Sequence, residues 1–129
     1  KPHGNWVMYY ENGKTPHIKE TYENGKLNGI RSTYYPSGKI QQEETLAFNL
    51  LAGPFKTYYE QGSVETTGEY KSNRKHGMFT AYYPTGIMKE QGEYVANKKH
   101  KVWKSFDEKG NLIRTITFKA GIEIETKTY

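Results

Sequence analysis

Aromatic residues and glycines recur along the chain at intervals of 24 or 25 residues. The most visible recurrence is a pair of neighbouring rings. These pairs are Tyr9-Tyr10, Tyr34-Tyr35, Tyr58-Tyr59 and Tyr82-Tyr83, with Phe106-Asp107 in the fifth place. Other columns keep the same register: one glycine five residues before nearly every pair, one glycine after it, and the hydrophobic series Tyr22, Leu46, Tyr70, Tyr94, Phe118. Several columns that share one period predict an architecture of about five repeats.

Each repeat has the pattern of a β-hairpin. Residues 77–83 are rich in aromatics and begin at a glycine, which is typical of a strand. The connection Pro84-Thr85-Gly86 has proline at a first turn corner and glycine in third place, which predicts a three-residue hairpin loop. Residues 63–70 then alternate between apolar or small and charged or polar positions, as a half-buried return strand does.

A second connection separates one hairpin from the next. Its column contains only glycine and asparagine: Gly25, Asn49, Asn73, Asn97 and Gly121. These two residue types tolerate positive φ better than others, so the column predicts a constrained turn. A 24-residue unit with two strands and two turns has no room for a helix.

We therefore predict an all-β fold, an elongated antiparallel meander of β-hairpin repeats in a single sheet of about ten strands. Residues 1–129 form one repeat domain in this interpretation. The repeats, numbered one to five, are residues 4–28, 29–52, 53–76, 77–100 and 101–121, and residues 122–129 form a terminal strand or cap.

The pattern leaves the buried face of the first strand open. Trp6, Phe55, Phe79 and Trp103 precede the first ring of each pair by three residues, so simple alternation puts the two columns on opposite faces. Either a bulge brings them to one face, which we expect, or both faces carry rings. The second ring position tolerates Asp107, which predicts exposure of the second tyrosines.

Composition explains how such a sheet could have a core. Ile, Leu and Val contribute only 17 of 129 residues, whereas Tyr, Phe and Trp contribute 19. A thick aliphatic core is therefore excluded, and a thin core of rings is expected. No run of about 18 apolar residues predicts a transmembrane helix. The chain begins without methionine, which suggests a processed product or a piece of a longer protein.

Neither catalysis nor metal binding is predicted. The chain has no cysteine, which excludes disulfides and thiolate chemistry. His3, His76 and His100 share one column, where successive repeats are about 10 Å apart, too far for one metal ion. Glu43 and Glu44 are adjacent and point to opposite faces of a strand. We therefore expect no enzyme activity, no cofactor and no metal.

Basic side chains gather in the second connections of repeats three and four, and the net charge is +5. The candidate binding residues are Arg74, Lys75, Lys98, Lys99 and Lys101, together with Tyr10, Tyr35, Tyr59 and Tyr83. A line of basic turns could bind an acidic protein, anionic lipid headgroups or nucleic acid. It could equally be a solvated edge whose lysines discourage aggregation. The tyrosines suit a protein interface or a cross-strand packing ladder.

The unit Gly-x-Trp/Phe-x-x-Tyr-Tyr-x-x-Gly, with a return strand ending in Gly-Glu-Tyr, resembles the bacterial variant of MORN repeats found in YwqK-type antitoxin proteins. The resemblance covers about five units. It departs where Arg31 replaces the ring, where Lys101 replaces glycine and where Asp107 replaces tyrosine. It implies an array of hairpins used for interaction or scaffolding, and the antitoxin label implies blocking of a partner toxin.

The combined expectation is a non-enzymatic module that binds another protein through its ringed face. The alternative is binding of an anionic surface, lipid headgroups or nucleic acid, through the basic turns. Open sheet edges at the two ends also predict end-to-end self-association. The compartment is left open, with the cell envelope or secretion favoured over the cytoplasm.

Overall fold

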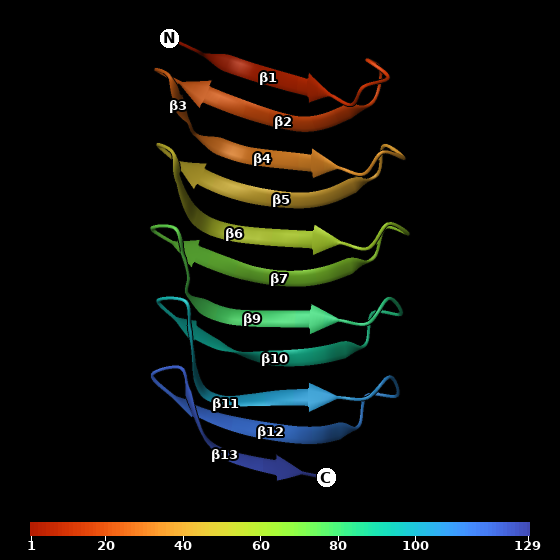
Figure 1. Ribbon diagram of the computed structural model, residues 1–129, viewed down its shortest axis with the longest axis vertical. Coiled ribbons are helices and arrows are strands. Elements are labelled where there is room, and N and C mark those ends of the chain that lie inside the picture. The colour runs from red at the N-terminus through yellow and green to blue at the C-terminus, as the bar shows by residue number, and fades with distance from the viewer.

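The computed structural model describes residues 1–129 and shows one open antiparallel sheet (Figure 1). Its strands are β1 (Gly4–Tyr9), β2 (Pro16–Glu23), β3 (Lys26–Leu27), β4 (Gly29–Tyr34), β5 (Ile40–Ala47), β6 (Leu50–Tyr58), β7 (Val64–Lys71), β8 (Arg74–Lys75), β9 (Gly77–Tyr82), β10 (Met88–Val95), β11 (Lys98–Phe106), β12 (Leu112–Lys119) and β13 (Ile122–Thr128). Eleven strands follow one another in sequence order, and the two-residue strands β3 and β8 pair with β2 and β7. The predicted all-β hairpin meander is confirmed. The chain forms no helix with the length and hydropathy that a membrane crossing requires.

The second connections are tight turns with two left-handed residues. Ser72 and Asn73 have φ values of 49° and 69°, and the corresponding residues of the other repeats behave alike. Positive φ at both central positions defines the type I′ hairpin turn, whose twist suits a twisted sheet. The prediction of positive φ for the glycine and asparagine column is confirmed. The second left-handed residue, at the Ser72 position, carries no such sequence signal.

The three-residue loops also form as predicted. The Gly62 N–H donates to the Tyr59 carbonyl at 2.9 Å, and Gly62 has a φ of 110°. The pairing that follows is irregular, because Thr57 faces Thr66 whereas Tyr58 faces Val64. Glu65 is therefore the extra residue of a bulge. The other four hairpins show a register shift at the same place.

This bulge lies in the return strand, so alternation along the first strand is undisturbed. Phe55 faces Glu44 on the neighbouring strand, whereas the Tyr58 hydroxyl donates to the carboxylate of Glu43 at 2.6 Å. Since Glu43 and Glu44 point to opposite faces, Phe55 and Tyr58 do too. The expectation that a bulge unites these two columns is wrong, and both faces carry rings. We call the face with Phe55 the ring face and the other the back face.

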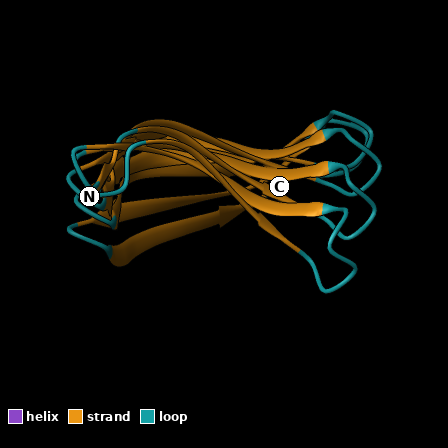
Figure 2. Ribbon diagram, turned by 90° about the horizontal axis from the view of Figure 1, so that it is seen from above, coloured by secondary structure: helices purple, strands orange, loops and turns teal.

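The sheet is a single curved layer, with the two kinds of turn along its two long edges (Figure 2). Only seven residues are buried, and the apolar side chains among them are Leu46, Phe55 and Trp103. A sheet normally buries its apolar face against a second layer. Here the rings of adjacent repeats take over that role, so the core is a strip along the ring face.

Candidate interaction surfaces

Five aromatic side chains form a continuous ladder across the ring face of repeats three to five. The members of this ring ladder are Phe55, Tyr70, Phe79, Tyr94 and Trp103. Neighbouring ring centroids are 4.9 to 6.4 Å apart, which is the range in which aromatic pairs attract. Phe55 and Trp103 are buried and the other three rings are half-buried. Burial raises the pKa of the Tyr70 and Tyr94 hydroxyls, and nearby Glu44 and Glu90 respectively raise it further.

Two glycines make room for the largest rings of the ladder. A Cβ added to Gly92 would lie 2.0 Å from Cδ2 of Trp103, and one added to Gly68 would lie 2.6 Å from Cε2 of Phe55. Neither glycine has a positive φ, so the backbone conformation does not require them. Their function is to let an indole or phenyl ring lie directly on the backbone of the adjacent strand.

Two lysine ammonium groups lie over the ladder. Nζ of Lys75 is 5.5 Å from the Phe79 centroid and 5.3 Å from that of Tyr94. Nζ of Lys99 is 4.6 Å from the Trp103 centroid. Both distances suit cation–π attraction. The ring face of repeats three to five is therefore apolar and positively charged at once.

In repeats one and two, a buried charge cluster takes the place of the ladder. Arg31 occupies the ring position, and its Nη1 lies 3.7 Å from Oε2 of Glu20 while its Nη2 lies 2.9 Å from Oε1 of Glu44. The two carboxylates are buried, with 8% of each residue exposed. Glu20, Arg31 and Glu44 form what we call the charge triad. Sequence reasoning noted Arg31 only as a departure from the repeat and did not pair it with the glutamates.

The candidate tyrosines tie each repeat to the next. The hydroxyls of Tyr35, Tyr59 and Tyr83 donate to backbone carbonyls 23 residues further on, at 2.6, 2.5 and 2.7 Å. Tyr10 donates to the Tyr34 carbonyl in the same way. All four are half-buried, which differs from the exposure expected for this column. Partial burial raises the pKa of Tyr35 and Tyr59, with Glu65 adding to the effect.

The candidate basic residues do not form one continuous line. Lys75 and Lys99 extend over the ring ladder, whereas Arg74 and Lys98 precede them in their strands and point to the back face. Lys101 replaces the strand-opening glycine and has a φ of 61°. The structure thus divides the predicted set between two faces and one strained backbone position.

Asparagine side chains also link the repeats. Asn97 donates its N–H to the Lys75 carbonyl at 2.9 Å, and its Oδ1 accepts from the Lys75 N–H at 2.7 Å. Asn49 and Asn73 bind residues 27 and 51 in the same two-bond manner. The column signalled turn geometry in the sequence, but its contact 22 residues back required the sheet register.

Comparison with known families gives one match. The family model described as the MORN repeat variant matches residues 2–15, 27–46, 51–72, 75–96 and 99–120. These segments cover most of the chain, and each contains one of the ring pairs or its equivalent. No curated protein matches the chain.

Proposed function

The chain belongs to the MORN repeat variant family, and we propose that it is a non-enzymatic module that binds another protein through its ring face. The observation that carries this proposal is an apolar sheet face without a second layer. Three rings of the ladder stay half-exposed, and Trp6 at the other end of the same face is 50% exposed. A partner would supply the missing layer.

The ring face also indicates the chemistry of that partner. Aromatic side chains are enriched in the cores of protein interfaces. Lys75 and Lys99 add positive charge beside the rings, which favours a partner with apolar side chains flanked by carboxylates. The resemblance to antitoxin-type repeat proteins supports the finer proposal that such binding blocks the partner's own activity.

The proposal assigns no catalytic group to the sheet. Glu20 and Glu44, the two buried carboxylates, share one guanidinium and so lack the free pairing that acid–base chemistry needs. Measurable turnover of hydrolase substrates by the purified chain, lost in the Glu44→Gln variant, would contradict this part of the proposal.

Site-specific photo-crosslinking tests the binding face. A photoreactive residue at Tyr22 reports on the ring face, and one at Lys56 reports on the back face opposite Phe55. We expect one discrete adduct in cells from position 22 and none from position 56. An adduct from position 56 alone would place the interface on the back face and overturn the proposal.

Salt dependence then separates the proposal from binding of anionic surfaces. Binding through the ring ladder should change little between about 50 and 200 mM salt, whereas binding through basic turns should fall steeply. Charge reversal by Arg74→Glu should leave the identified partner's affinity unchanged. The matched variant Lys99→Glu should lower it, because Lys99 lies over the ladder.

A further inference from the structure

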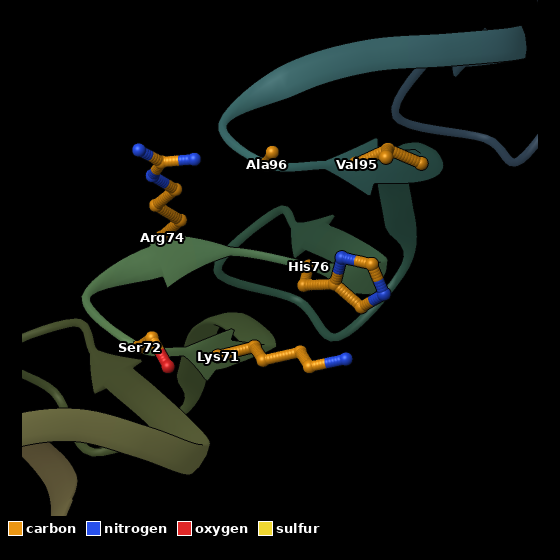
Figure 3. A pocket seen from close by; sticks show the side chains of 6 residues that line it. All are labelled: Lys71, Ser72, Arg74, His76, Val95 and Ala96. Carbon is orange, nitrogen blue, oxygen red and sulfur yellow. The ribbon is translucent and has the colours of Figure 1, made fainter.

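A hollow opens on the back face where the type I′ turn of repeat three meets that of repeat four. It has a volume of about 400 Å³ and is lined by Lys71, Ser72, Arg74, His76, Val95 and Ala96 (Figure 3). None of its three basic side chains forms a salt bridge within the chain. We propose that this hollow binds a single phosphate group, separately from the protein partner of the ring face.

The turn itself brings the basic residues together. Lys71 and Arg74 are cross-strand partners on either side of Ser72 and Asn73, so their side chains leave the same face. His76 lies two residues beyond Arg74, on that face again. In Figure 3, Lys71 and His76 extend in the same direction, and Arg74 rises from the other arm of the turn.

The walls of the hollow are held in place before any ligand arrives. Both backbone groups of Lys75 bond to Asn97, which fixes the turn of repeat four against that of repeat three. The His76 N–H donates to the Glu69 carbonyl at 3.0 Å. A site with fixed walls loses less conformational entropy when it binds a ligand.

The basic set is specific to repeat three and is not a property of every turn. The positions of Lys71, Arg74 and His76 are counted at 24-residue intervals along the chain. Repeat one has Glu23, Lys26 and Asn28; repeat two has Ala47, Leu50 and Ala52; repeat four has Val95, Lys98 and His100. Only repeat three therefore combines three basic side chains at these positions.

These donors fit a phosphate better than a smaller or singly charged anion. A guanidinium can bind two phosphate oxygens at once, and an ammonium can bind a third as a point charge. Two carboxylates, Glu69 and Glu93, stand two residues before Lys71 and Val95 on the same face, and neither forms a salt bridge. Because they repel anions, we expect binding to need both Lys71 and Arg74.

Backbone amide NMR of the ¹⁵N-labelled chain, titrated with inorganic phosphate, tests the proposal. We expect saturable shifts confined to residues 71–76 and 95–97, and no such shifts with sodium chloride at equal ionic strength. Arg74→Gln and Lys71→Gln should each weaken binding about tenfold, since each removes a charge-assisted contact. The exposed position of both side chains allows these variants to fold.

Matched variants and a second ligand source complete the test. Lys98→Gln, at the Arg74 position of repeat four, should leave phosphate binding unchanged. Vesicles of phosphatidic acid in phosphatidylcholine, compared with glycerol phosphate, distinguish a lipid headgroup from a free phosphate monoester as the source. Equal losses in Lys98→Gln and Arg74→Gln, or shifts spread over all basic turns, would overturn the proposal.

Discussion

Arg31 donates two hydrogen bonds to one oxygen of Glu44, from Nε at 3.1 Å and from Nη2 at 2.9 Å. One repeat later the same two positions hold Phe55 and Gly68, where a phenyl ring lies on a glycine backbone. The array thus fills one place in its core by two different means, a charge pair and a ring on glycine.

This relationship predicts a large effect for loss of the guanidinium. Arg31→Met should lower the free energy of unfolding by about 3 kcal/mol, because Glu20 and Glu44 would remain buried without a counter-charge. Urea denaturation followed by tryptophan fluorescence measures the change.

The double variant Arg31→Phe/Glu44→Gly is the matched control. It copies the order glutamate, ring, glycine that surrounds Phe55. Its stability should return to within about 1 kcal/mol of wild type. A single variant as stable as wild type would show that the charge triad is dispensable.

The ring seats predict that one methyl group is enough to disturb the ladder. Gly92→Ala should cost about 2–3 kcal/mol, because its Cβ would overlap the buried Trp103 indole. Thermal unfolding by circular dichroism provides the measurement.

Gly86→Ala separates overlap from backbone strain. Gly86 has a φ of 94° and nothing within 4 Å of an added Cβ, so only the strain of positive φ, about 1 kcal/mol, should be lost. Equal effects at the two positions would mean that the ladder tolerates the extra atom.

Lys101 offers a stabilising substitution. It is the one residue other than glycine at the strand-opening position, and its φ of 61° is unfavourable for a side chain. Lys101→Gly should raise stability by about 1 kcal/mol, seen as a higher urea midpoint with an unchanged slope. Lys101→Ala, which keeps the Cβ, should give no such gain.

Tyr58 predicts a pH dependence at the alkaline end. Its hydrogen bond to Glu43, with help from burial, raises the pKa of the Tyr58 hydroxyl to about 12. An unfolded tyrosine ionises near 10, so between about pH 10 and 12 the unfolded state binds fewer protons. The stabilising contribution of this group is therefore complete below pH 10 and is lost as the pH rises toward 12.

Tyrosinate absorbance near 295 nm detects this group directly. Glu43→Gln should bring one late-titrating tyrosine back toward pH 10, and Tyr58→Phe should remove it altogether. An identical titration curve for wild type and Glu43→Gln would contradict the assignment.

Much of the fold could be predicted because it repeats. A turn residue such as Asn73 or Gly62 reports its backbone geometry through residue type alone, and a regular period then places every strand. The face of the first ring of each pair could not be predicted in this way. The deciding bulge residue, Glu65, lies in the return strand, and nothing in the period shows which strand contains the extra residue.

The candidate surfaces were less accessible to sequence reasoning for a similar reason. Lys75 and Arg74 are neighbours in the chain, yet only the strand register separates them onto different faces. The bond from Tyr59 to the Tyr82 carbonyl joins residues 23 positions apart, beyond any local pattern. Residue types identified the surfaces, and only the register distributed the side chains among them.

The orientation of the strands has a mechanical consequence. All strands run across the long axis of the sheet, and the two termini lie at its opposite ends (Figure 1). Tension between the termini would therefore act along the interstrand hydrogen bonds and detach one strand after another. A sheet pulled parallel to its strands would instead have to break a whole row of bonds at once. The array is consequently built to lengthen in small steps under load, repeat by repeat, while the remaining repeats stay folded.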